Sequence, residues 1–346
     1  MTNRRDRLLA LLPPESQGIL ITDPRNLFYL TGFTGEGELL LSDQGLLLLT
    51  DGRFLGEAEA CGLPYAVRGP GAEHDHAALA RGLDIAGLAI EADHMSHAEA
   101  LQLQQNIPLA ATRGLVAQLR VCKDAGEIAA LRRAITLTDN LLCDIMSWCS
   151  FGHCERQIAA CLNFEAMSRG ASGESFPAIV AAGVNAAKPH AQPGDDLARD
   201  GNLLIDCGFV VDGYCSDVTR TRVGRAPAPI ARAAELVHAA HDAALAHYRP
   251  GVPLRDAHMA AVQVFAQAEM EQHFTHSLGH GVGLNVHEEP RIGPASQGVF
   301  REGMVVSCEP GLYFPGIGGV RHENLILITA DGPEPLTRAP QWRETI

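Results

Sequence analysis

The chain has 346 residues, enough for two domains that each bury a sizeable hydrophobic core. The composition is that of a globular protein, with 46% hydrophobic and 20% charged residues and no low-complexity tract. The formal net charge of −14 argues against a nucleic-acid or anionic-membrane partner, since either would require a basic face.

The sequence contains no apolar run of the length, about 18 residues, that a membrane-spanning helix requires. The N-terminal stretch MTNRRDRLLALLPPE has too few apolar residues before its two prolines for a secretory signal. The nine cysteines include no C-x-x-C pair, so neither a disulfide framework nor a thiolate zinc site is indicated. Cys207, Cys215 and Cys308 lie in apolar runs and are expected in the core. We therefore expect a cytoplasmic protein.

The first third of the chain alternates predicted strands and helices. Residues 18–23 (GILITD) and 38–51 (ELLLSDQGLLLLTD) are apolar runs bounded by turn residues. The second run predicts a hairpin around Asp43-Gln44-Gly45. A further strand is predicted over 82–93.

The rest of the chain predicts long helices mixed with strand-rich segments. From Ala125 apolar residues recur every three or four positions, and Asp124 precedes them as a candidate N-cap. The predicted helices cover 125–149, 153–169, 228–247 and 254–273, and the predicted strands lie at 178–182, 202–221, 303–309 and 319–329. This order predicts an α+β fold with antiparallel strands. We place the boundary near residue 120, between domains 1–120 and 121–346.

The segment 202–221, NLLIDCGFVVDGYCSDVTRT, carries two acids in apolar surroundings. Its Asp212-Gly213 dipeptide favours a two-residue type I′ hairpin turn. That register places Asp217 opposite Gly208, with Asp206 two residues further along on the same face. The two carboxylates are therefore predicted to be diagonal neighbours.

Two buried carboxylates in this arrangement would repel each other and raise each other's pKa. A bound cation would reverse both penalties. In the alternative interpretation, one aspartate accepts backbone hydrogen bonds in a turn and the other pairs with Arg220 or Arg222. The segment alone does not decide between the two.

Two further acids lie in similar surroundings. Glu309 ends the apolar run MVVSCE, and Glu323 falls inside the predicted strand GVRHENLILIT. Taken singly, Glu323 could equally be an edge or salt-bridge residue, with Arg321 as its partner. Together with the hairpin acids, both extend the set of candidate metal ligands.

The stretch SLGHGVGLNVHEEP, residues 277–290, places His280 and His287 seven positions apart. On a straight strand their side chains would face opposite sides, so the segment must bend for both to reach one pocket. Its glycines permit that bend. The Walker pattern, a dinucleotide fingerprint and G-x-S-x-G are all missing, which argues against nucleotide binding and a serine nucleophile.

Taken together, these segments resemble the Xaa-Pro peptidase branch of the pita-bread metallopeptidases, which includes prolidase and aminopeptidase P. The resembling segments are FPAIVAAGVNAAKPHAQP (176–193), IDCGFVVDGYCSDVTRT (205–221), HSLGHGVGLNVHEEP (276–290), CEPGLY (308–313) and GGVRHENLILIT (318–329). DPRNLFYLTGFTGEGELLL (23–41) and RVCKDAGEIAALRRA (120–134) are similar too. The resemblance covers nearly the whole chain. It implies an N-terminal α/β creatinase/prolidase-like domain followed by a pita-bread domain with an antiparallel sheet.

The resemblance also implies a site for two divalent metal ions. The implied ligands are Asp206, Asp217, His280, Glu309 and Glu323. Four carboxylates balance the charge of two divalent ions. One imidazole among oxygen ligands suits Mn²⁺, with Co²⁺ and Zn²⁺ as alternatives.

The resemblance assigns further residues to catalysis and substrate binding. His190 and His287 match the two histidines of the family's substrate pocket, and Glu309 would serve as general base. A metal-bound hydroxide would attack the carbonyl preceding proline, with His287 as donor to the oxyanion and His190 positioning substrate or protonating the leaving nitrogen. Arg321 resembles a substrate-binding or network-organising arginine, and Arg291 could approach a proline carboxylate.

From this resemblance we expect a homodimeric enzyme that hydrolyses peptides with proline in the second position. The compact chain favours the aminopeptidase P type, and a prolidase restricted to dipeptides is the alternative. A non-catalytic binding protein and a hydrolase or lyase of non-peptide substrates are alternatives on the same fold. The binding protein is not favoured, because such relatives usually lose metal ligands and all five implied ligands are present here. The hydrolase or lyase would be metal-dependent and would keep the same ligands.

Overall fold

The computed structural model describes residues 2–148, 152–195 and 201–341. The chain divides into two units, Met1–Arg120 and Val121–Ile346, each with its own core. The division lies just before the long helix that begins at Ala125. Within the described residues, no helix is long and apolar enough to cross a membrane.

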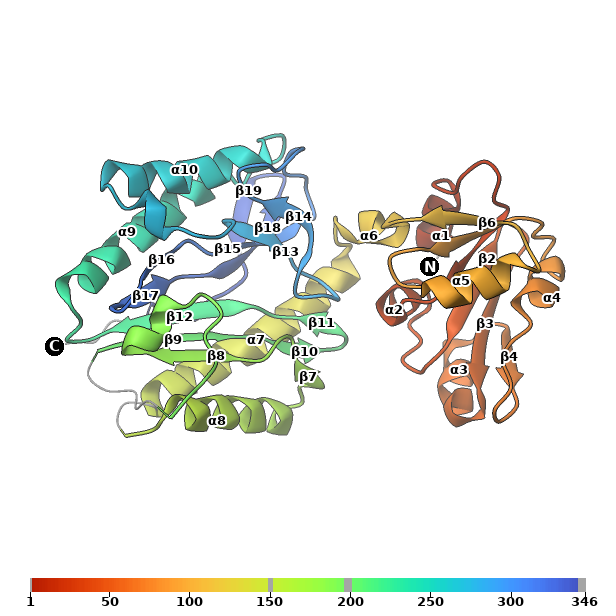
Figure 1. Ribbon diagram of the computed structural model, residues 1–346, viewed down its shortest axis with the longest axis horizontal. Coiled ribbons are helices and arrows are strands. Elements are labelled where there is room, and N and C mark those ends of the chain that lie inside the picture. Colours follow the sequence, from red (N-terminus) through yellow and green to blue (C-terminus); the bar gives the residue numbers. More distant parts are fainter. Residues whose placement is uncertain (1, 149–151, 196–200, 342–346) are drawn as a thin grey trace. The chain divides into compact units, whose positions relative to one another are not determined.

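The first unit is built around a six-stranded sheet with the order β4-β3-β2-β1-β5-β6 (Figure 1). Strand β2 runs antiparallel to both of its neighbours, and the other pairings are parallel. The strands are β1 (Gly18–Ile21), β2 (Glu38–Ser42), β3 (Leu46–Asp51), β4 (Tyr65–Arg68), β5 (Leu88–Glu91) and β6 (Leu109–Thr112). The helices are α1 (Thr2–Leu9), α2 (Pro24–Thr31), α3 (Leu55–Cys61), α4 (His76–Arg81), α5 (His97–Gln104) and α6 (Leu115–Arg120). The predicted α/β domain is confirmed, as is the β2–β3 hairpin.

The predicted strand at 82–93 is too long, since only Leu88–Glu91 forms β5. The preceding residues close helix α4, where the Ile85 amide donates to the Ala80 carbonyl at 3.0 Å. Asp84 adopts a left-handed conformation with φ of 55° in this turn. Ile85 is nevertheless buried in the core of the unit, so its apolar pattern extended the prediction beyond the strand.

In the second unit the strands lie between two pairs of helices (Figure 1). The helices are α7 (Ala125–Trp148), α8 (Glu155–Ser168), α9 (Ala228–Leu245) and α10 (Leu254–Gln267). The strands are β7 (Gly173–Glu174), β8 (Ile179–Ala182), β9 (Asn202–Cys207), β10 (Phe209–Val211), β11 (Tyr214–Cys215), β12 (Val218–Val223), β13 (Gly279–Gly281), β14 (Glu288–Ile292), β15 (Val305–Cys308), β16 (Gly311–Phe314), β17 (Gly318–Arg321), β18 (Asn324–Thr329) and β19 (Gly332–Pro335). Every pairing found among these described strands is antiparallel, which confirms the predicted fold class.

One core packs α9 and α10 against β15 to β18, and another packs α7 and α8 against β8 to β10. The three cysteines predicted to be core residues are buried: Cys207, Cys215 and Cys308.

The helix predictions hold to within two residues at the described ends, except at the end of α10. Helix α7 follows Asp124, whose carboxylate accepts a hydrogen bond from the Glu127 amide at 3.0 Å, as the predicted cap requires. Residue 149, the predicted end of that helix, lies outside the described residues. Helix α10 ends at Gln267 rather than at residue 273, because Glu269 turns the chain with a left-handed φ of 56°. A separate 3₁₀ turn, Glu271–His273, follows.

The acidic hairpin has the predicted turn and register. Asp212 and Gly213 both have positive φ, 51° and 82°, as a type I′ turn requires. Thr219 lies opposite Asp206 in the β9–β12 pair, which continues the register set by the turn. The two predicted strands are nevertheless divided into four, because β10 and β11 belong to one sheet and β9 and β12 to another.

The predicted strand at 319–329 is likewise divided in two. Its first part, β17, pairs with β16, and its second part, β18, pairs with β15 and β19 in a different sheet. His322 and Glu323 form the break between them. Glu323 is therefore not inside a strand, and the alternating pattern does not fix the direction of its side chain.

Candidate metal centre

Acidic side chains of the second unit lie where the chain passes from one sheet to another. Asp217 lies between β11 and β12, Glu309 between β15 and β16, and Glu323 between β17 and β18. Asp206 is the last residue but one of β9, just before the chain changes sheet at Gly208. At such breaks the side chains no longer have to alternate between the two faces of a strand. Side chains from several segments can therefore point to one place.

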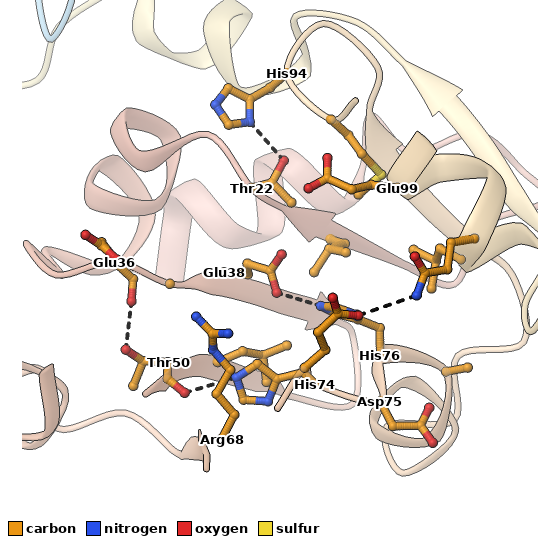
Figure 2. Close-up of a pocket in the computed structure, with 18 of the residues that line it drawn as sticks. Thr22, Glu36, Glu38, Thr50, Arg68, His74, Asp75, His76, His94 and Glu99 are labelled. Carbon is orange, nitrogen blue, oxygen red and sulfur yellow. Dashed lines mark hydrogen bonds and ion pairs between the residues drawn. The ribbon is translucent and has the colours of Figure 1, made fainter. Parts of the chain in front are cut away.

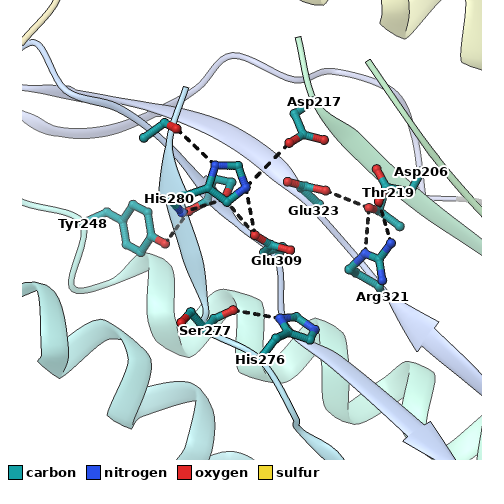
Figure 3. A network of polar contacts seen from close by, with 12 residues as sticks. Asp206, Asp217, Thr219, Tyr248, His276, Ser277, His280, Glu309, Arg321 and Glu323 are labelled. Atoms are coloured by element: carbon teal, nitrogen blue, oxygen red, sulfur yellow. Dashed lines mark hydrogen bonds and ion pairs between the residues drawn. The ribbon is translucent and has the colours of Figure 1, made fainter. Parts of the chain in front are cut away.

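Two of these acidic side chains converge closely with His280. Asp217, His280 and Glu323 each offer a ligand atom, and these atoms all lie within 4.8 Å of one another (Figure 3). Asp217 and Glu323 are buried, with 5% and 2% of their surface exposed. Among the residues that the structure describes, no other group of histidine, cysteine and acidic side chains converges in this way.

The His280 ring has a fixed orientation in this group. Its Nδ1 donates to the Gly281 carbonyl at 3.1 Å, which directs Nε2 towards Asp217 Oδ2 at 3.7 Å and Glu309 Oε1 at 3.2 Å. Ser307 Oγ accepts from the His280 amide at 3.0 Å and donates to Glu309 Oε1 at 3.2 Å. A histidine whose Nδ1 is held by a carbonyl presents Nε2 to a metal ion.

The His280–Glu309 contact changes the pKa of both groups. Burial lowers the pKa of His280, but its hydrogen bond to Glu309 and the charges of Glu309 and Glu323 together outweigh burial and raise the pKa to about 9. Burial likewise raises the pKa of Glu309, and the hydrogen bond and charge of His280 bring it down to about 2. Without a metal ion, the two side chains therefore form an ion pair at neutral pH.

Asp206 joins the group through Arg321. The Arg321 Nη2 donates to Asp206 Oδ2 at 2.5 Å, and its Nε donates to Thr219 Oγ1 at 3.1 Å. Thr219 Oγ1 in turn donates to Glu323 Oε2 at 2.7 Å, and Tyr313 accepts from Arg321 Nη1 at 2.6 Å. Arg321 therefore connects Asp206 to Thr219 and, through Thr219, to Glu323.

The alternative partners considered for the hairpin acids do not pair with them. Arg220 is buried and donates to backbone carbonyls, including those of Ala339 at 2.6 Å and Glu323 at 2.6 Å. No ion pair between Arg220 or Arg222 and Asp206 or Asp217 occurs in the described part of the chain.

Several polar residues of this network were not singled out from the sequence: Thr219, His276, Ser307 and Tyr313. Tyr313 links Arg321 to His276, whose Nε2 lies 3.0 Å from the Tyr313 hydroxyl. Three of the four belong to the segments that carry the family resemblance. Thr219 could have been found, because it follows Asp217 by two residues and shares its face of the hairpin.

The acidic residues fit a site for divalent metal ions. Asp206 Oδ1 and Glu323 Oε1 are buried and have no hydrogen-bond partner among the described residues. Burial raises the pKa of Asp206, and burial together with the charge of Glu323 raises that of Asp217 well above its usual range. Burial and the charge of Glu309 raise the pKa of Glu323 to about 8. Cations bound to these oxygens would supply the missing partners and offset the repulsion.

The other predicted site residues lie at the edge of the group. The His287 ring centroid lies 4.3 Å from that of His280, and burial and the charge of His280 lower the pKa of His287. Arg291 lies opposite His280 in the β13–β14 register, so both side chains are on the same face. His190 is exposed, and its charge and that of Arg291 also lower the pKa of His287.

Comparison with known proteins agrees with this geometry. Residues 129–330 match the model of metallopeptidase family M24, and residues 4–122 match the creatinase/prolidase N-terminal domain. This chain belongs to metallopeptidase family M24. The resemblance found in the sequence is thereby confirmed, and the M24 chain is a metal-dependent peptidase.

Similar proteins, two of them of known structure, match more than nine-tenths of the chain. An Xaa-Pro dipeptidase from Bacillus anthracis is 31% identical, with a TM-score of 0.94 and 98% of each chain covered. An X-Pro aminopeptidase from Thermotoga maritima is 28% identical, with a TM-score of 0.90, covering 98% of this chain and 99% of that one. A putative dipeptidase of Bacillus subtilis is 33% identical over 334 residues, which is 91% of this chain and 92% of the relative.

Proposed function

We propose that this M24 peptidase hydrolyses the peptide bond between an N-terminal residue and a following proline. Its metal ions would be held by the five implied ligands: Asp206, Asp217, His280, Glu309 and Glu323. The observation that carries the proposal is the convergence of Asp217, His280 and Glu323, next to buried carboxylate oxygens that lack hydrogen-bond donors. The oxygen-rich donor set with one imidazole favours two Mn²⁺ ions, with Co²⁺ or Zn²⁺ as alternatives.

When bound, the ions would polarise the carbonyl group that precedes proline and activate the attacking water. Glu309 would take the proton of that water and pass it towards the nitrogen of proline. His287, beside His280, would donate a hydrogen bond to the carbonyl oxygen as negative charge develops on it. His190 would position the substrate or protonate the departing nitrogen, and Arg321 would hold the ligands Asp206 and Glu323 in place through its contacts.

Of the two kinds of Xaa-Pro peptidase, we propose the dipeptidase. Arg291 shares a face with His280, and its exposed side chain makes no ion pair with the described residues. A guanidinium in this position can bind the free carboxylate of an Xaa-Pro dipeptide, a group that a longer peptide replaces with an amide. Two of the three relatives described above carry dipeptidase names. The aminopeptidase P activity expected from the compact chain is the other outcome of the test.

The test compares three substrates on protein reconstituted with Mn²⁺: an Xaa-Pro dipeptide, its C-terminal amide and an Xaa-Pro-Yaa tripeptide. We expect the dipeptide to have the highest kcat/KM. Arg291→Gln should lower that value about tenfold, the effect of one charged hydrogen bond, and leave turnover of the amide unchanged. Arg301→Gln removes an exposed charge elsewhere in the same unit and serves as the control.

Comparable or faster turnover of the tripeptide would instead establish an aminopeptidase P. Cleavage of none of the three substrates would contradict the Xaa-Pro proposal as a whole.

We further propose that the chain forms a homodimer, as its resemblance to the Xaa-Pro peptidases implies. Light scattering of the purified protein should give the mass of two chains. A monomer mass over the working range of concentrations would contradict this prediction.

A further inference from the structure

The first unit contains a cavity of about 710 Å³ (Figure 2). All its lining residues lie between Leu20 and Asn106, so the cavity belongs to this unit alone. Thr22 follows strand β1, Arg68 ends β4 and His94 follows β5, while Glu38 begins the antiparallel strand β2 at the same edge. The cavity therefore lies at the carboxyl ends of the parallel strands.

The connections of the sheet change direction at this edge. From β1 the chain continues to one side through β2, β3 and β4, and it then returns to the other side of β1 to form β5 and β6. In open α/β sheets, ligands bind outside the carboxyl ends of strands where the connections part in opposite directions. The position of the cavity is thus that of a ligand site, independently of which side chains line it.

Acidic side chains predominate in the lining. Of the charged lining groups, Glu36 is paired with Arg53 at 2.7 Å and Arg68 with Asp51 at 3.3 Å, both partners lying outside the lining. The other acids are Glu38, Glu73, Asp75 and Glu99, of which Glu38 contacts Nε2 of the lining His76 at 2.5 Å. Only three histidines can offset them, so at neutral pH the cavity favours a positively charged ligand.

The helix N-termini beside the cavity, those of α2 and α5, do not favour a phosphate-bearing ligand. In α/β folds such ligands bind the free amides at a helix N-terminus. Asp23 accepts the Arg25 amide at the start of α2 at 2.7 Å, and Ser96 accepts the Glu99 amide at the start of α5 at 3.2 Å. The protein's own side chains thus occupy the positions that an anion would need.

The histidines and the apolar side chains of the cavity indicate which other groups a cationic ligand would carry. His74 Nε2 donates to the Thr50 carbonyl at 3.0 Å, so Nδ1 of the neutral ring is an acceptor for a ligand N–H group. Leu20 and Leu49 are buried in the wall, and Met95 and Leu103 are partly buried beside them. Such a wall suits an aliphatic chain rather than a bare ion. The cavity side chains also do not form a convergent metal-ligand group.

We propose that this cavity binds a small organic cation, an ammonium or guanidinium group on a short aliphatic chain. The acids Glu38 and Glu99 bind the charged group, His74 accepts one of its N–H groups, and the aliphatic chain packs on the partly exposed Met95 and Leu103. This site is additional to the peptidase centre and does not depend on the proposed Xaa-Pro activity.

The test is calorimetric titration of the full chain with agmatine, which carries a guanidinium and an ammonium group on a four-carbon chain. We expect saturable binding that weakens as salt is added, because the attraction is between charges. Adipate, a dianion, and pentanediol, a neutral diol, should not bind. Binding of adipate as strong as that of agmatine, or no heat with agmatine at millimolar concentration, would overturn the proposal.

Variants locate the site. The double change Glu38→Gln and Glu99→Gln should weaken agmatine binding at least about tenfold, because it removes two charges while each amide oxygen can still accept its present hydrogen bond. Glu57→Gln, on the exposed surface of α3, makes the same kind of change outside the cavity and should have no effect.

The imidazole NMR signals give a second measurement that needs no variant. Agmatine should shift the signals of His74 and His76 and leave that of His258, in the second unit, unmoved. An equal loss of binding in Glu57→Gln, or unchanged His74 and His76 signals at saturation, would contradict this site.

Discussion

Asp217→Asn should abolish metal-dependent hydrolysis and leave the metal-free protein at least as stable as the wild type. A bound metal ion supplies several kcal/mol to the transition state, so we expect kcat/KM to fall roughly a thousandfold or more. Without metal, the Asp217 carboxylate destabilises the fold, because it is buried beside Glu323 and Asp206. Its pKa is accordingly raised well above its usual range. Removing its charge relieves that repulsion.

The variant is expected to lose activity but not the stability of the metal-free protein. This combination distinguishes a metal ligand from a residue that only stabilises the fold. Thermal unfolding should be measured after chelation and again with excess Mn²⁺. The free energy of unfolding of the wild type should rise by about 4 kcal/mol when the ion is present at a thousand times its Kd. The variant should show little of this increase. Glu323→Gln should behave in the same way.

Asp212→Asn is the matched control, because it makes the same chemical change five residues earlier. Asp212 is exposed at the hairpin turn, where Asn tolerates its left-handed φ of 51°. The control should keep both activity and the response to Mn²⁺. An Asp217→Asn protein that binds two ions and retains full turnover would exclude Asp217 as a ligand.

The turn residues and the two-residue period of strands predicted the register of the acidic hairpin. The Asp212-Gly213 turn and the two-residue period of strands fix the register, and with it the shared face of Asp206 and Asp217. A turn of this type allows few registers. The two turn residues therefore fix how the ten residues on either side of them pair. That part of the site could therefore be derived without reference to any relative.

The changes between sheets could not be predicted. Residues 319–329 form an apolar run because both halves are buried, but β17 is buried in one sheet and β18 in another. A burial pattern records that a side chain is covered and not which element covers it. The break at Glu323 was therefore missed, although it is the break that frees Glu323 to point at the candidate metal centre.

The supporting network was missed for a related reason. Thr219 contacts Glu323 across 104 positions, and His276 contacts Tyr313 across 37. The partners lie far apart in the sequence, so no local pattern pairs them, although the hairpin register places Thr219 on the face of Asp217. The five implied ligands were accessible because the family resemblance supplied them as a set.

The glycines around His280 have a different role from the one expected. None of Gly279, Gly281 and Gly283 adopts a positive φ, and the bend comes from a register shift between His280 and Gly281. They are needed because other segments of the same chain pass close to them. A Cβ atom at Gly279 would lie 2.2 Å from the Ser307 carbonyl oxygen.

Gly279→Ala should therefore both destabilise the protein and weaken metal binding. The added methyl group meets backbone and forces β13 away from β15, at a cost of about 1–3 kcal/mol or more. The same movement pulls apart the contacts of Ser307 Oγ with the His280 amide and the Glu309 carboxylate. Loss of a group that orients metal ligands lowers metal affinity roughly 10–100-fold. Thermal unfolding and a competition titration with a fluorescent chelator measure the two effects.

Gly173→Ala provides the control, since a Cβ at Gly173 meets nothing within 4 Å and its φ is not positive. Alanine there should leave metal affinity unchanged and raise stability by a few tenths of a kcal/mol, because it restricts the unfolded chain. If Gly279→Ala matched this control in both measurements, the close approach of β13 to Ser307 would not be what holds His280 beside Glu309. If it lost stability alone, with metal affinity intact, the position of His280 would depend on the Gly281 carbonyl and not on Ser307.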